Sequence, residues 1–205
     1  ATGYPLDRVA AKNAGGKRLD ELPNAVTDKT QAAFEPALDY CVIKIPRWPF
    51  DKFPSGDRSV TTQMKATGEV MAIDRSFEAA LQKAVRSLEF SGRTLLWEDP
   101  EWRSGGTFSL DRLPLVPHDL RLSAMMAAIR RAVDSDTLME RTNIDPWFIS
   151  ALERIVAMER RLLSEPLRPD LLWRAKRLGF SDEQVGTLAD MLPEQVRNLR
   201  HQWDL

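Results

Sequence analysis

The chain has 205 residues, 43% of them hydrophobic, and 29 Lys and Arg residues stand against 30 Asp and Glu residues. This length and composition predict a globular protein with at least one hydrophobic core, and the balanced charge argues against a nucleic acid or a membrane as partner. No apolar run of about 18 residues could span a bilayer. The first thirty residues lack the pattern of a signal peptide, and the single cysteine cannot form an internal disulfide, so the expected location is the cytoplasm.

The first part of the chain mixes helix and strand signals. Apolar residues recur at helical spacing after Pro5 and stop at a Gly-Gly pair, which predicts a short amphipathic helix. The stretch LDYCVIKI, residues 38–45, predicts a strand that Pro46 and Pro49 end by removing backbone donors. A loop rich in aromatic and turn-forming residues follows.

The segment 62–72, TQMKATGEVMA, predicts a strand, a tight turn at its Thr-Gly pair and a second strand. Its inward positions would mix Met64 and Met71 with Glu69, and an isolated carboxylate on an apolar face is unfavourable. Two explanations stay open: Glu69 faces water, or it forms an ion pair with a lysine such as Lys65 or with an arginine. Both predict a partly buried carboxylate.

A clear helical stripe follows the N-cap residue Ser76, and the opposite face of this helix is expected to lie in solvent. The stretch 90–117 contains several glycines and prolines and little periodicity, which is typical of a connector between domains. We therefore expect two domains, residues 1–89 and residues 90–205.

The second domain is expected to be entirely helical. Trp147 lies beside Phe148 at a predicted helix start, and aromatic residues of this kind concentrate at interfaces. The expected helices are 122–133, 137–141, a longer one capped by Asp145, and three short ones that begin near Pro169, Ser181 and Pro193.

The residues that could carry chemistry are few. His118 and His201 lie far apart without metal-ligand spacing, so surface or capping roles are expected and no catalytic, cofactor-binding or metal-binding residue is predicted. The two short helices within residues 179–201 could form a helix-turn-helix with Arg197 and Arg200 on its second helix. An independent helical module, with DNA as a possible partner, is therefore the alternative function.

Two sets of sequence stretches resemble the large chain of carbamoyl phosphate synthetase. The stretches ATGYPLDRVAAK, AAFEPALDYCVIKIPRWPFDKF, TTQMKATGEVMAI and FEAALQKAVRSLE are similar to the end of its first, carboxyphosphate-forming ATP-grasp domain. TNIDPWFISALERIVAMERRL, RAKRLGFSDEQVGTLA and VRNLRHQWDL are similar to its helical oligomerisation domain. The runs NAGGKRL and DRS depart from the family pattern.

The resemblance implies an α+β fold: residues 1–89 would be the C-terminal part of the ATP-grasp domain, and residues 90–205 an all-α oligomerisation domain. The family's enzyme is an ATP-dependent ligase that makes carbamoyl phosphate from bicarbonate, glutamine-derived ammonia and two ATP, for arginine and pyrimidine biosynthesis. ATP, magnesium or manganese, and potassium belong to that parent enzyme. The chain itself is expected to be an excised fragment without an ATP site and inactive alone.

The resemblance also implies roles for particular residues. In the family, carbamate passes through an internal tunnel between the two ATP-grasp halves, and the matching positions here are Pro46, Met64 and Glu69. Helices within residues 124–163 are expected to make oligomer contacts. The implied partners are the rest of the large chain, the glutamine amidotransferase small subunit and further copies of the chain, with no nucleic acid and no membrane.

Overall fold

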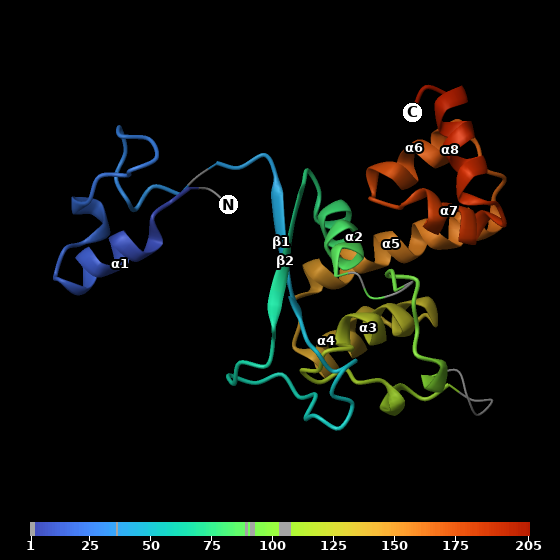
Figure 1. Ribbon diagram of the computed structural model, residues 1–205, viewed down its shortest axis with the longest axis horizontal. Helices are drawn as coiled ribbons and strands as arrows, with labels where there is room; N and C mark the ends of the chain where they lie inside the picture. The colour runs from blue at the N-terminus through green and yellow to red at the C-terminus, as the bar shows by residue number, and fades with distance from the viewer. Residues whose placement is uncertain (1–2, 36, 89, 91–92, 103–107) are drawn as a thin grey trace. The chain divides into compact units, whose positions relative to one another are not determined.

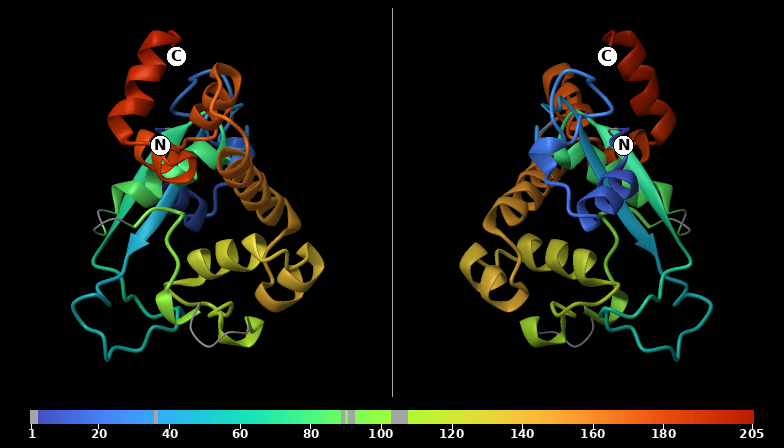
Figure 2. Two further views of the ribbon diagram at one scale, coloured as in Figure 1. Left: turned by 90° about the vertical axis from the view of Figure 1, so that its right-hand side faces the viewer. Right: turned by 90° about the vertical axis from the view of Figure 1, so that its left-hand side faces the viewer.

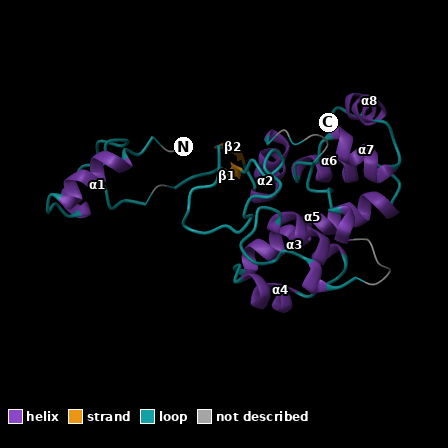
Figure 3. Ribbon diagram, turned by 60° about the horizontal axis from the view of Figure 1, so that its bottom comes forward, coloured by secondary structure: helices purple, strands orange, loops and turns teal. Residues whose placement is uncertain are grey.

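The computed structural model describes residues 3–35, 37–88, 90, 93–102 and 108–205. These residues form two compact units, Ala1–Tyr40 and Cys41–Leu205, called unit 1 and unit 2 below. Helices dominate the described chain, and the strands form a single pair, so the predicted α+β class is confirmed (Figure 3).

Unit 1 contains α1 (Leu6–Ala14) and a 3₁₀ helix, Leu19–Glu21. The helix predicted after Pro5 is confirmed. Two hydrogen bonds close the unit. The backbone N–H of Ala32 donates to the carbonyl of Leu22 at 2.7 Å, and the Tyr4 hydroxyl donates to the carbonyl of Ala32 at 2.9 Å. None of the residues of α1 is buried, and Leu6 is 71% exposed.

Unit 2 begins with an antiparallel pair of strands, β1 (Cys41–Arg47) and β2 (Gly68–Asp74), joined by a long loop. The predicted tight hairpin within residues 62–72 is therefore wrong: β2 pairs with β1, and the residues before Gly68 belong to the loop. Pro46 does not end β1 but pairs with Glu69. A proline is tolerated here because, in the described chain, β1 has β2 as its single neighbour and an edge strand can lack a donor.

Helix α2 (Phe77–Ser87) covers one face of this strand pair (Figure 1). As predicted, the Ser76 hydroxyl caps it by accepting from the N–H of Ala79 at 3.2 Å. The expectation that its other face lies in solvent is wrong, because Glu78 and Gln82 are buried against the following helices. Both faces of α2 thus make packing contacts.

The rest of unit 2 is helical, as predicted. The long helix α5 runs beneath α2, with α3 and α4 toward one of its ends and α6, α7 and α8 toward the other (Figures 1 and 2). The bounds are α3 (Arg121–Arg130), α4 (Ser135–Thr142), α5 (Pro146–Ser164), α6 (Pro169–Arg177), α7 (Asp182–Ala189) and α8 (Pro193–Gln202). The caps predicted at Asp145 and Ser181 are present.

The stretch expected to be a connector contributes to the core instead of linking two cores. It contains the 3₁₀ helices Pro100–Trp102 and Leu110–Arg112. Four of its apolar residues are buried in the same cluster as the helices: Leu95, Trp102, Leu113 and Leu115. Part of the predicted connector, residues 91–92 and 103–107, lies outside the described residues.

A buried ion-pair network holds this stretch against the helices. Arg130 of α3 donates to Glu159 of α5 at 2.7 Å and to Glu98 at 3.0 Å, and it also donates to the carbonyl of Leu95 at 2.6 Å. Arg131 donates to the other oxygen of Glu98 at 2.8 Å. Burial by itself raises the pKa of Glu98, but the hydrogen bonds from Arg131 and Arg130 outweigh it and hold this pKa below its ordinary value.

Helix α2 is fastened to the C-terminal helices by polar side chains. The Gln82 amide donates to the carbonyl of Leu178 at 2.9 Å, and the Gln184 amide donates to Gln82 at 2.8 Å. Arg86 donates to the carbonyl of Gly179 at 2.7 Å. These bonds join α2 to the same body as α6 and α7, while the assignment of residues 1–89 and 90–205 to two parent domains stays a prediction.

Candidate functional site

The residues singled out for the carbamate tunnel fall on or near one face of the strand pair. Side chains alternate along a strand, so Ile43, Ile45 and Ala72 face α2 and the positions between them face away. We call that second face the outer face; its members are Val42, Lys44 and Pro46 of β1 and Glu69, Met71 and Ile73 of β2.

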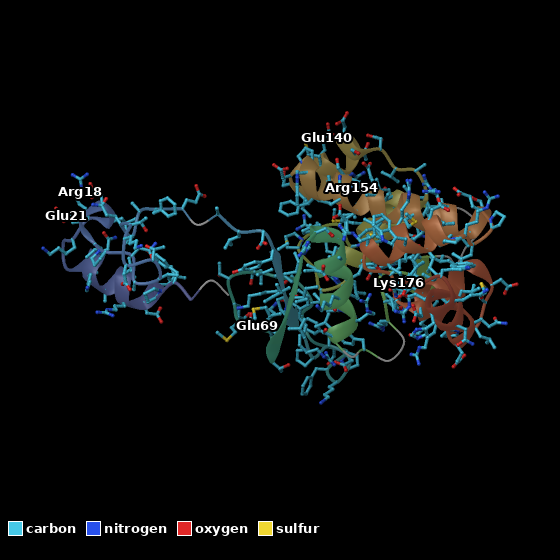
Figure 4. The ribbon with its side chains drawn as sticks, turned by 90° about the horizontal axis from the view of Figure 1, so that it is seen from above. Arg18, Glu21, Glu69, Glu140, Arg154 and Lys176 are labelled. Carbon is cyan, nitrogen blue, oxygen red and sulfur yellow. The ribbon has the colours of Figure 1, made fainter. Side chains whose placement is uncertain are left out.

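Pro46 and Glu69 are direct cross-strand partners in the outer face. Glu69 forms an ion pair with Lys44 at 2.5 Å, and the Glu69 side chain is 56% exposed (Figure 4). The expectation of a partly buried carboxylate is therefore wrong for this chain, and so is Lys65 as its partner. In water an exposed pair of this kind contributes about 0.2–1 kcal/mol, so Glu69 carries no large burial cost.

Met64 lies in the loop before β2 and is 92% exposed. It is not part of the strand pair, so the structure brings together two of the three predicted tunnel positions and leaves the third on the loop. Lys65, next to it, points elsewhere: its ammonium donates to Asp57 at 2.7 Å and to the carbonyl of Ser59 at 2.6 Å. The hydrogen bond from Lys65 lowers the pKa of Asp57.

The loop between β1 and β2 is fixed to the residues that precede α3. Arg58 makes two hydrogen bonds to Asp119, at 2.8 and 2.6 Å. The N–H of Val60 donates to the carbonyl of Pro117 at 2.9 Å. A bidentate arginine–carboxylate pair has a defined geometry, so this loop has a set path beside the residues that precede α3.

The described residues contain little of what catalysis needs. No group of three or more His, Cys, Asp or Glu that could hold a metal ion occurs among them. The Nδ1 of His118 accepts from the N–H of Leu120, the residue before α3, at 3.1 Å, and burial lowers the pKa of His118. Cys41, predicted to be a strand residue, is the first residue of β1, and burial raises the pKa of its thiol.

The helices predicted to make oligomer contacts differ in what they expose. Residues 124–129 of α3 are all buried within unit 2, so these residues offer no apolar surface to a partner. Helix α5 instead exposes Trp147 and Phe148 at its start. Their rings contact Phe77 of α2, at centroid distances of 5.3 and 5.5 Å. We call these three residues the aromatic patch.

The alternative DNA-binding function depends on α7 and α8. These helices do pack together as a short pair, but Arg200 is engaged within the unit, where it donates to Asp182 at 3.1 Å. One of the two arginines that the alternative requires is thus held by an internal carboxylate.

Of the helices in the described chain, none is both long enough and apolar enough to cross a membrane.

The strand pair covered by α2 and the helices built on one shared core define an α+β chain dominated by helices, whose exposed features include the outer face of the strand pair and the aromatic patch. The model of one family, described as "Carbamoyl-phosphate synthetase large chain, oligomerisation domain", matches residues 69–204. The chain belongs to this carbamoyl phosphate synthetase large-chain family.

Individual relatives are similar along the full chain. The carbamoyl phosphate synthase large chain of Thermomicrobium roseum is 56% identical over 200 residues, which is 98% of this chain and 18% of the relative. That of Caldanaerobacter subterraneus is 51% identical over 205 residues, 100% of this chain and 19% of the relative. The N-terminal section of the large chain of Methanopyrus kandleri is 46% identical, over 98% of this chain and 38% of the relative. The chain thus spans about a fifth of the full-length large chains that it matches.

Sequence reasoning missed Lys44 as the partner of Glu69. Its signal was present, since Lys44 is a charged residue within a β-rich stretch, but the partner follows only from the register of β1 against β2. The network around Arg130 was missed because Glu98 belongs to a stretch without periodicity, where the sequence gives no direction for a side chain.

Proposed function

We propose that this chain is a structural and conductive segment of a carbamoyl phosphate synthetase large subunit. In this proposal the parent enzyme makes carbamoyl phosphate in the cytoplasm from bicarbonate, glutamine-derived ammonia and ATP, with its metal ions and ATP bound outside the segment. The segment closes the first ATP-grasp domain, joins other parts of the large chain and the amidotransferase subunit, and contributes to self-association. The observation that carries the proposal is the family match over residues 69–204 together with about 50% identity along the whole chain.

The tunnel role is supported by the outer face. A passage for a small anion needs a wall that is polar and hydrated at some points, because a dry apolar wall would impose a desolvation cost on the ion. Glu69 is paired with Lys44 and exposed in the segment alone, and Pro46 lies opposite it. If another part of the large chain covered this face, the wall of the passage would carry the charged Lys44–Glu69 pair, which can bind water.

The tunnel proposal predicts that Glu69→Lys uncouples the two halves of the intact synthetase. Bicarbonate-dependent ATP hydrolysis at the first half should continue, while carbamoyl phosphate formation per ATP consumed should fall about tenfold, equivalent to about 1.4 kcal/mol. Both rates are measured in the same assay. Glu165→Gln is the matched control, because Glu165 is also an exposed carboxylate in an ion pair, with Arg161 at 2.7 Å. If Glu69→Lys leaves the yield of carbamoyl phosphate per ATP unchanged, Glu69 does not line the passage.

Self-association is proposed to use the aromatic patch. Two of its residues, Trp147 and Phe148, are exposed aromatic residues within the range 124–163, where oligomer contacts are expected. Trp147→Ser should weaken the association of the chain by about tenfold or more, because exposed tryptophans are frequent anchors of interfaces. Sedimentation velocity over a concentration series measures this, with circular dichroism to show that the fold is kept. Trp173→Ser is the control, since Trp173 on α6 is similarly exposed, 51% against 55% for Trp147. Equal weakening by both variants would contradict a specific role for the patch.

A further inference from the structure

A cavity of about 580 Å³ lies inside unit 2, between the inner face of the strand pair with α2 and the residues that open α3. Its volume is within the range of small-molecule sites. Ile43 and Ile45 of β1 and Leu81 and Val85 of α2 form one wall. Six aromatic residues also line it: Trp48, Phe50, Phe77, Phe90, Trp97 and Phe148.

The carboxylates at the cavity wall are already paired. Asp119 accepts two hydrogen bonds from Arg58, and Asp51 forms an ion pair with Arg47 at 2.8 Å. Lys44, also at the wall, is paired with Glu69. Because the charges of these pairs cancel, any net positive charge at the cavity wall comes from its other cations.

One of these remaining cations is Arg121, the first residue of α3. Its Nη2 donates to the carbonyl of Thr142, but its Nε is buried and has no hydrogen-bond partner. Among the described residues it forms no ion pair with a carboxylate, and burial lowers its pKa. The second is Arg93, which stacks over the Trp97 ring at 4.0 Å and likewise has no carboxylate partner in the described chain.

The position of Arg121 adds to the excess of positive charge. The N-terminus of a helix carries a partial positive charge, which favours an anion and disfavours a cation. No side chain caps the N-terminus of α3, and Arg121 occupies its first turn. An arginine without a carboxylate partner at this position would be stabilised by an anionic group in the cavity.

We propose that this cavity binds a small organic monocarboxylate with an aromatic or branched apolar body. The body lies between the aromatic walls, and the carboxylate pairs with the guanidinium group of Arg121. A single carboxylate fits better than a phosphate, because the walls offer two unpaired arginines amid apolar surface and no cluster of polar donors. The cavity shares Phe77 and Phe148 with the aromatic patch, but binding of a carboxylate is a property that the tunnel and assembly roles proposed above do not require.

The first test compares two probes of equal size, 3-phenylpropionate and the neutral 3-phenylpropan-1-ol, titrated into the 205-residue chain by NMR or calorimetry. The carboxylate should bind about tenfold more tightly than the alcohol, the difference expected for one hydrogen bond to a charged group. Equal affinity for the two probes, or no binding of either at millimolar concentration, would overturn the proposal.

Three variants locate the binding. Arg121→Met should reduce binding of 3-phenylpropionate to the level of the alcohol, and Arg174→Met, which removes an exposed charge away from the cavity, should leave binding unchanged. Ser123→Leu places a larger side chain at the cavity wall and should block both probes without loss of stability. This variant keeps the test decisive if Arg121→Met fails to fold. Unchanged binding in Ser123→Leu would place the probe elsewhere and refute the site.

Discussion

Gly179→Ala should destabilise unit 2 by about 4 kcal/mol, the sum of left-handed strain and steric overlap. Gly179 has φ +89°, and a Cβ added there would lie 2.7 Å from Cα of Ala79 and 3.1 Å from its carbonyl oxygen. Both contacts are with backbone atoms of α2, which cannot rotate away. The substitution must therefore push α2 from the loop between α6 and α7.

Urea denaturation followed by tryptophan fluorescence measures this loss, because all six tryptophans of the sequence lie in unit 2. Gly68→Ala is the matched control: nothing lies within 4 Å of its added Cβ, and its stability should change by less than about 1 kcal/mol. If Gly179→Ala behaves like this control, α2 is not docked against the C-terminal helices as described.

Arg130→Met should cost about 3–5 kcal/mol, the second large effect expected. The substitution leaves buried Glu159 without its ion-pair partner and leaves buried Glu98 with Arg131 alone. Arg161→Met removes an arginine from an exposed ion pair with Glu165, so its cost should be under about 1 kcal/mol. Similar unfolding free energies for the two variants would show that the network around Arg130 is not formed.

The same network predicts a dependence of stability on acid. The pKa of Glu98 is lowered in the folded chain, so the unfolded chain binds its proton first as pH falls. The stabilisation by Glu98 is therefore complete above the ordinary carboxyl range and is lost as pH decreases through the folded pKa. Arg130→Met should weaken this acid sensitivity, which a series of unfolding curves at decreasing pH would reveal.

Elements with strong local signals were predictable from the sequence. Asp145 and Ser181 cap helices because their side-chain oxygens accept from backbone N–H groups two and three residues further along the chain, a contact set by neighbouring residues. The partner of β2 was not predictable in this way, because a Thr-Gly pair favours a tight hairpin while the actual partner is separated from it by a long loop. Pairing of distant strands depends on tertiary packing.

The errors at the candidate site have the same origin. Glu69 was expected to be partly buried because the pattern of residues 62–72 was assigned to a hairpin with an inward face. In the actual register Glu69 lies on the outer face, next to Lys44. The polar face of α2 was likewise expected in solvent, since a glutamine is usually exposed, yet Gln82 is buried because Gln184 and the carbonyl of Leu178 satisfy its amide.

Solution mass tests the central claim, that unit 2 is one folded body that carries the self-association of this segment. Light scattering over a concentration series would compare the full chain with a shortened chain of residues 41–205; a cut at residue 90 would remove α2 from the core. The account predicts the same discrete oligomer for both chains, and a monomer for each after Trp147→Ser. Association of the longer chain alone, or monomers throughout, would contradict it.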